Sequence, residues 1–200
     1  MRTTLLILIA LACRPDLPAP ATAPQLPYAR QALDLGRTRD DAMYEAFSRS
    51  YALTPADAID RAEVVTEFRR AVMIVRDHVN QGEYTFTEQD LAKAMAPYAG
   101  QVTVIVQVRL HPLHTYANTP QYDLYVETGP ATRPLAPARF RRDAVLPLGA
   151  VGPGHTILAV RLEGTFPRAD IEAASAPAII VTDDQANVLW KTRLDLTRYR

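Results

Sequence analysis

Two histidines three positions apart, His111 and His114, are the residues best placed to do chemistry, because they directly follow a valine-rich run. Imidazole nitrogens bind zinc or copper, and a nearby carboxylate can complete such a site. Asp123 and Glu127 share one face of a predicted strand, because alternate residues of a strand point the same way. The pattern allows a metal site, but histidines beside a proline also occur at strand ends without binding anything.

Three tyrosines surround the same stretch, at positions 116, 122 and 125. Aromatic rings beside polar groups can hold a sugar or a peptide, although tyrosines also simply cover the edge of a sheet. The candidate residues for a ligand or metal are therefore His111, His114, Tyr116, Tyr122 and Asp123.

A cluster of arginines provides a second candidate site. Arg139, Arg141 and Arg142 follow a proline-containing loop, and guanidinium groups bind phosphate or carboxylate. They could contact an anionic partner. Strand alternation would equally leave Arg139 and Arg141 solvated on one side of a strand.

The sequence contains no recognisable catalytic motif. The three serines, Ser48, Ser50 and Ser175, lie outside any G-x-S-x-G turn, and Walker, G-x-G-x-x-G and H-E-x-x-H patterns are absent. We therefore expect no enzymatic activity and no cofactor. A hydrolase would require one of the four histidines to meet a carboxylate from a distant position.

The N-terminus has the pattern of an export signal. Arg2 precedes an apolar run over residues 5–12, which ends at Cys13, the single cysteine of the chain. A membrane span needs about 20 apolar residues, so this run is too short to be an anchor. It predicts a cleaved signal peptide over residues 1–12.

The residues around this cysteine, Ala10-Leu11-Ala12-Cys13, resemble the lipobox of bacterial lipoproteins. The resemblance implies that the Cys13 thiol is acylated and that Cys13 becomes the new N-terminus. Arg14 follows, and in the family's sorting rule a residue other than Asp points to the outer membrane. Ala10 departs from the favoured leucine, and Ala10-Leu11-Ala12 also fits ordinary signal cleavage, which cuts the same bond.

A proline-rich segment comes next. Residues 14–27 contain five prolines, which prevent helix and sheet formation and favour an extended spacer of about 40 Å. We assign residues 13–38 to the lipid-attachment site and tether, and residues 39–200 to one α+β domain.

Composition supports a globular domain, with 48% apolar and 22% charged residues. Its 22 basic and 22 acidic residues give a net charge of zero, which argues against nucleic acid as a partner.

The first half of the domain, residues 39–98, is predicted to be mainly helical. Thr54 and Pro55 resemble a helix start, and apolar residues at spacings of three and four then predict one long helix over about 55–80. Shorter helices are expected over 40–49 and from Thr87, with Asp90 completing the cap, to a point before Pro97.

The second half, residues 101–198, is predicted to be mainly β. Alternating patterns indicate strands at 102–110, 122–128, 140–146, 156–164, 178–182 and 188–196, with a hairpin turn at 183–187. The expected fold class is α+β, an N-terminal helical segment followed by an antiparallel β-sandwich-like sheet.

These observations predict an exported, membrane-tethered lipoprotein that is a non-catalytic binding or scaffold component of the bacterial cell envelope. Its expected partners are the membrane, through the N-terminal lipid, and an envelope protein. The expected location is the outer membrane, facing the periplasm or the cell surface. The alternative is a periplasmic binding protein that uses the region from His111 to Tyr125 for a metal, glycan or small molecule.

Overall fold

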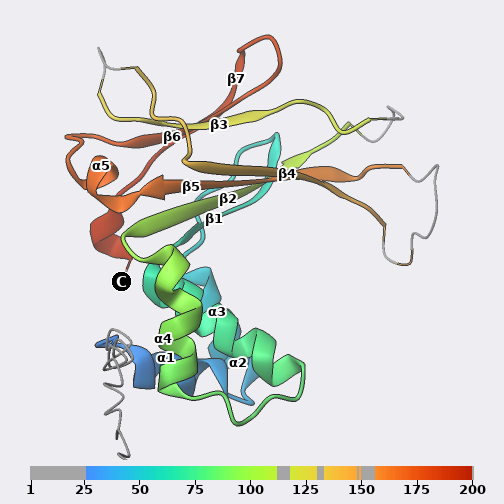
Figure 1. The fold of residues 1–200 in the computed structure, drawn as a ribbon. Helices are drawn as coiled ribbons and strands as arrows, with labels where there is room; N and C mark the ends of the chain where they lie inside the picture. The colour runs from blue at the N-terminus through green and yellow to red at the C-terminus, as the bar shows by residue number, and fades with distance from the viewer. Residues whose placement is uncertain (1–25, 112–117, 130–132, 148, 150–155, 200) are drawn as a thin grey trace, which may run out of the picture.

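A computed structural model describes residues 26–111, 118–129, 133–147, 149 and 156–199. Two antiparallel sheets face each other, and a layer of helices lies below one end of the larger sheet (Figure 1). The larger sheet has the order β1 (Ile59–Val65), β2 (Gln101–Arg109), β5 (Ala159–Pro167), β4 (Arg139–Val145). The smaller sheet has the order β3 (Asp123–Glu127), β6 (Ala178–Thr182), β7 (Val188–Arg193).

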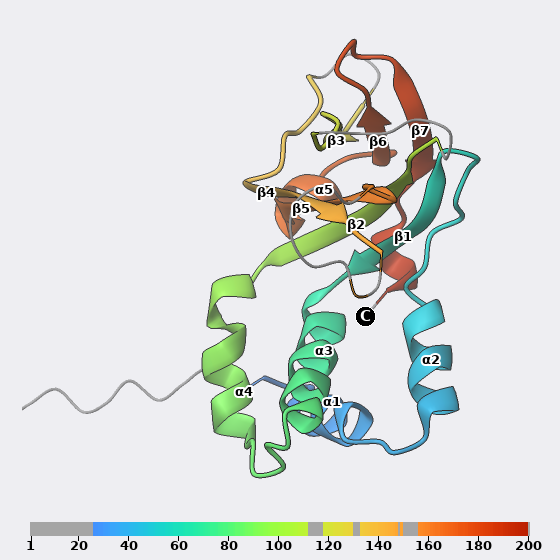
Figure 2. The same cartoon turned by 90° about the vertical axis from the view of Figure 1, so that its right-hand side faces the viewer.

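The helical layer is built around α3 (Glu67–Asn80), which packs against α1 (Ala29–Gly36) and α4 (Glu88–Met95). Figure 2 shows α2 (Asp41–Arg49) to one side of α3 and α4 on the other. The remaining helical turns are η1 (Ala96–Tyr98), α5 (Arg168–Glu172) and η2 (Leu196–Arg198).

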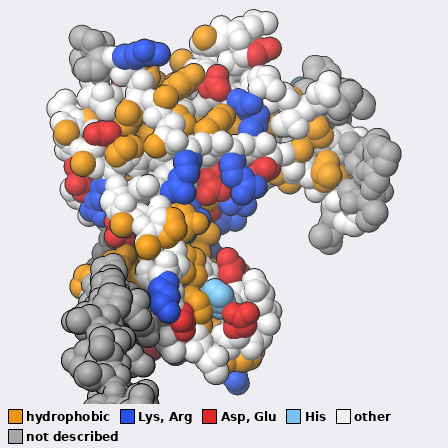
Figure 3. Space-filling model, in the orientation of Figure 1, with side chains coloured by type: hydrophobic (Ala, Val, Ile, Leu, Met, Phe, Trp, Pro, Cys, Tyr) orange, Lys and Arg blue, Asp and Glu red, His pale blue; other side chains and the backbone are white. Residues whose placement is uncertain are grey.

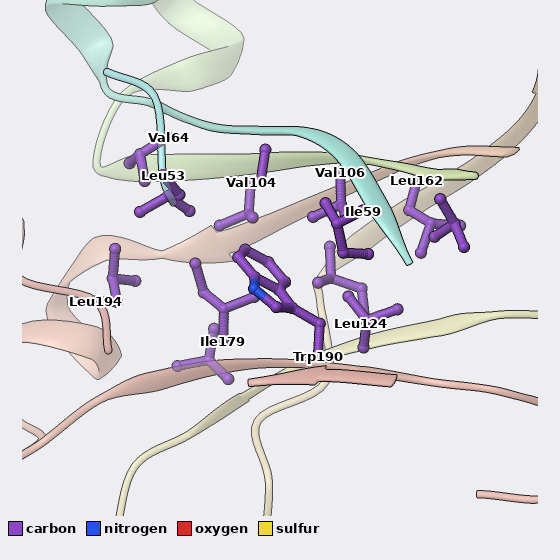
Figure 4. Close-up of a cluster of buried hydrophobic side chains, with 14 of the residues drawn as sticks. Leu53, Ile59, Val64, Val104, Val106, Leu124, Leu162, Ile179, Trp190 and Leu194 are labelled. Atoms are coloured by element: carbon purple, nitrogen blue, oxygen red, sulfur yellow. The ribbon is translucent and has the colours of Figure 1, made fainter. Parts of the chain in front are cut away.

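The main hydrophobic core fills the space between the two sheets. Alternate residues of β2, from Val102 to Val108, point into it, and Trp190 of β7 faces them from the smaller sheet (Figure 4). The sheets approach closely at Gly164, where a Cβ atom would lie 2.8 Å from Leu124 Cδ2. A residue larger than glycine would push the sheets apart at this point.

The predicted fold class is confirmed: the chain combines helices with two antiparallel sheets in an α+β arrangement. The predicted strands are present, although β5 lies three residues later than expected and β7 ends at Arg193. The hairpin between β6 and β7 is also confirmed. The Asp183 carboxylate accepts hydrogen bonds from the Asn187 side chain and from the backbone of Asn187 and Gln185, which lowers the pKa of Asp183.

The long helix predicted over about 55–80 is wrong in its first half. Residues 59–65 form β1, and the helix begins only at Glu67, where the Thr66 hydroxyl caps it by accepting from Arg69 N. The apolar spacing alone fits either a helix or a strand. Val64 and Val65 are β-branched, which favours a strand. The hydrogen bonds between this segment and β2 outweigh its helix propensity. The segment 39–98 therefore contributes an edge strand to the larger sheet.

The outer edge of that strand is covered by the chain that precedes it. Leu53 N donates to Ala62 O at 2.8 Å, and Val64 N donates to Tyr51 O at 2.9 Å. In the smaller sheet, Leu135 covers the outer edge of β3 through two backbone hydrogen bonds with Val126. Such coverage protects exposed sheet edges from pairing with other chains.

The predicted boundary between tether and domain at residue 38 is also wrong. Residues 29–36 form α1, in which Ala32 and Leu33 are buried against α3. The last proline of the tether, Pro27, immediately precedes this helix, so the loss of prolines marks the start of the domain better than the boundary we predicted.

Replacing Gly36 with alanine should test whether α1 belongs to the folded unit. The new Cβ would lie 2.5 Å from Val75 Cβ on α3, so we expect Gly36→Ala to destabilise the domain by about 1–3 kcal/mol. Urea unfolding would measure the loss. Arg30→Ala, at an exposed position of the same helix, is the control; equal stability of both variants would contradict the packing of α1 on α3.

The predicted cap of α4 is confirmed and gives a pH dependence. Thr87 accepts from Asp90 N, and the Asp90 carboxylate accepts from Thr87 N and Oγ1, which lowers the pKa of Asp90 below 3.8. A lowered carboxylate pKa contributes stability above the unfolded-state pKa, and this contribution is lost as the pH falls through the folded-state pKa.

We therefore expect Asp90→Asn to lower the thermal midpoint at neutral pH and to match the wild type in strong acid. Circular dichroism melts from about pH 7 to about pH 2 would measure this convergence. Glu88→Gln is the control, since the Glu88 carboxylate has no hydrogen-bond partner among the described residues. A difference between Asp90→Asn and wild type that is constant with pH would contradict the assignment.

Candidate functional site

The predicted ligand or metal site is only partly described. His111 follows the end of β2, whereas His114 and Tyr116 lie outside the described residues. Tyr122 packs partly buried against the sandwich core, and Asp123 begins β3. Within the described part of the chain, no three His, Cys, Asp or Glu side chains are grouped as a metal site requires. A site that includes His114 stays a prediction.

Arg142 binds polar groups of Gln121, Tyr122 and Asp123. Its Nε and Nη2 donate to Tyr122 O at 3.0 and 2.7 Å, and its Nη2 lies 3.1 Å from Asp123 Oδ1. Its Nη1 donates to Gln121 Oε1 at 2.5 Å. The guanidinium therefore joins β4 to the start of β3, and Asp123 already has a cationic partner.

This placement corrects the predicted anionic-partner patch. Arg139 and Arg141 lie on the outer face of the larger sheet, but Arg142 alternates to the other side and is committed to the contacts just described. The three arginines therefore do not share one face of the sheet, because neighbouring residues of a strand point to opposite faces.

The sheet register adds other charged residues to Arg139 and Arg141. Glu63, Ile105, Glu163 and Arg141 lie in one row across the strands, and Arg61, Gln107, Arg161 and Asp143 lie in the next. Arg70 reaches this surface from α3 and pairs with Glu163 at 3.2 Å. We call this surface the arginine face: Arg61, Arg70, Arg139, Arg141 and Arg161, with Glu63, Glu163 and Asp143.

Two guanidinium groups of the arginine face stack on one ring. Arg70 lies 4.9 Å and Arg139 lies 5.6 Å from the centroid of Tyr98, which ends η1. Arg139 Nη2 also donates to Pro97 O at 2.9 Å and to Gln101 Oε1 at 2.5 Å. These contacts fix both side chains at the junction between the sandwich and the helical layer, which we call the waist.

A buried arginine lies behind this surface. The Arg69 side chain is 4% exposed, and its only ion pair in the described structure is with Glu63, at 3.6 Å from Nη2 to Oε2. Its Nε and Nη1 have no hydrogen-bond partner among the described residues. Instead, the guanidinium is surrounded by the rings of Tyr44, Phe47 and Tyr51, whose centroids lie 5.3–5.8 Å away.

Two small hollows have acidic side chains in their linings. One of about 250 Å³ lies between α2 and β1 and is lined partly by Glu45, Arg49, Arg61 and Glu63. Another, of about 260 Å³, lies between α5 and the end of β7. Neither lining contains a histidine; the titratable acids are Glu45 and Glu63 in the first hollow and Glu172 and Asp195 in the second.

Sequence reasoning missed Arg61, Arg70, Arg161 and Glu163 as members of this surface. Arg61 and Arg70 were assigned to one long helix, so their separate positions on β1 and α3 were not accessible. Alternation in β5 does place Arg161 and Glu163 on one side. Only the strand order, however, places β5 beside β4 and therefore Arg161 diagonally next to Arg141.

Comparison with known proteins gave no relative: no family model, no curated protein and no solved structure matches this chain. In the described ranges, every helix is too short or too polar to cross a membrane.

The Arg69–Glu63 pair should be tested by a double-mutant cycle. Glu63→Gln leaves the buried Arg69 cation uncompensated, and we expect a loss of about 3 kcal/mol in unfolding free energy. Adding Arg69→Met removes that cation and should restore part of the loss. Urea unfolding would give the coupling energy.

The control is Glu45→Gln, which breaks the exposed Arg49–Glu45 pair and should change the free energy of unfolding by less than about 0.5 kcal/mol. Strictly additive effects of the two core substitutions would argue against the pair.

Proposed function

We propose that this chain is an exported bacterial lipoprotein, anchored through acylated Cys13, whose folded domain binds another protein of the cell envelope without catalysing a reaction. One observation carries the proposal: the single cysteine directly follows the apolar run, at the position where acylation requires it. The proline-rich segment after it would then hold the domain away from the membrane at a distance of about 40 Å.

The point of entry into the domain agrees with such a tether. Leu26 and Tyr28 pack against the helical layer. The tether would therefore join the domain at the helices, and the sandwich would lie beyond them, farther from the tether. Tethering raises the local concentration of a domain near membrane-proximal partners, which strengthens weak binding without new contacts.

The non-catalytic part of the proposal is supported by how the described histidines lie. His78 is at the end of α3, where it contacts Glu83 and stacks on Phe86, with ring centroids 4.0 Å apart. His111 follows β2 in the sandwich, in a different layer of the molecule. A catalytic group that combines them would have to span both layers.

The alternative function, a periplasmic ligand-binding protein, has less support. Asp123, the carboxylate proposed to complete its site, forms an ion pair with Arg142. A metal or glycan at this position would have to compete with that guanidinium.

Mass spectrometry of the mature N-terminus tests the anchor. We expect a chain that begins at Cys13 and carries a diacylglyceryl thioether, and we expect Cys13→Ser to move the protein from the membrane to the soluble periplasmic fraction. Arg14→Asp is a matched control: by the sorting rule of the family it should shift the protein to the inner membrane with the lipid mass unchanged. An unmodified Cys13 thiol on a soluble periplasmic protein would end the proposal.

A further inference from the structure

We infer that the arginine face is the docking surface for an acidic segment of a partner protein. The inference rests on the proposed function, since it specifies the chemistry of the envelope partner. In Figure 3, Lys and Arg side chains lie on both sides of an acidic group over β4 and β5, at the waist between the sandwich and the helical layer.

The surface carries more positive charge than it neutralises. Six arginines, counting buried Arg69, share the three carboxylates Glu63, Glu163 and Asp143. Arg139 is bound only to neutral acceptors, and Arg161 has neither an ion pair nor a hydrogen bond among the described residues. Because the whole chain has a net charge of zero, this excess is a local segregation of charge.

Several of these guanidinium groups are held in place before any partner binds. Arg70 is 14% exposed, pairs with Glu163 and stacks on the same Tyr98 ring as Arg139. Arg139 is fixed by its two hydrogen bonds, whereas Arg141 is 72% exposed and only lies 3.1 Å from Asp143. A side chain that is already ordered loses less conformational entropy on binding, so these groups are suited to pairing with carboxylates.

The spacing of the exposed arginines fits a polypeptide. Arg61 on β1 and Arg161 on β5 are paired through Gln107 on the strand between them, which sets them about 10 Å apart. Acidic residues three apart in a polyproline II segment, which has three residues per turn, or seven apart on a helix, have about the same separation on one face. A polypeptide presents carboxylates at such fixed intervals.

Binding of a fluorescein-labelled oligoglutamate peptide tests the surface directly. The full chain carrying Cys13→Ser is used, so that no acyl group contributes, and fluorescence anisotropy is recorded at low ionic strength. We expect Arg141→Gln with Arg161→Gln to weaken binding about tenfold or more, because two charge-assisted contacts are lost. The control, Arg30→Gln with Arg198→Gln, removes the same charge from exposed positions on α1 and η2 and should leave the affinity unchanged.

Three outcomes would overturn the inference. The first is a wild-type chain that does not bind the peptide, and the second is an equal loss in the control, which would indicate attraction by net charge alone. The third is an Arg141- and Arg161-dependent binding to vesicles of phosphatidylglycerol and phosphatidylcholine without binding to the peptide, which would assign the face to a membrane.

These results are separable from the test of the anchor. Peptide binding that depends on the arginine face would stand even if Cys13 were unmodified. An acylated Cys13 with no peptide binding would retain the anchor and reject this surface.

Discussion

The burial of the Arg69 guanidinium is the constraint on which the arrangement of the two layers depends. A cation at this depth needs a counter-charge, and Glu63 of β1 supplies it, so the helical layer cannot leave the sheet without separating Arg69 from its partner. The pair is long, and two nitrogens of Arg69 lack hydrogen bonds in the described structure. The surrounding aromatic rings therefore supply much of the stabilisation, through cation–π attraction.

The same arginine determines how α2 is held. None of the nine residues of α2 is buried, so this helix contributes little hydrophobic area to its own attachment. Its contacts run through Phe47, which packs against both hydrophobic clusters and faces Arg69, and through Tyr44 and Asp41, which contact Arg76. A helix attached through a few partly buried side chains has a smaller share of the folding energy than one with fully buried residues, such as α1.

How far sequence predicts this molecule depends on whether the decisive interaction is local. The cap of α4 and the turn after β6 were predictable because Thr87 with Asp90, and Asp183 with Asn187, bond within a few residues. The valine alternation of β2 is equally local. The strand at 59–65 was not predictable, since its apolar spacing also fits a helix and only its pairing with β2 decides between them. For the same reason, the sequence indicated Arg139 and Arg141 as candidate binding residues, but it could not show that Arg161 and Arg70 lie on the same surface.

The junction between β1 and α3 has a mechanical consequence. Thr66 alone separates the strand from the helix, and it caps the helix as well, so no flexible loop lies between the two elements. A pull on the chain at Leu26 would enter α1, pass by side-chain packing into α3, and reach the hydrogen-bond ladder between β1 and β2. Any component of the force directed along β1 would load these backbone hydrogen bonds together instead of one after another. The junction would thus help the domain to resist tension between its N-terminal end and a partner bound to the sandwich.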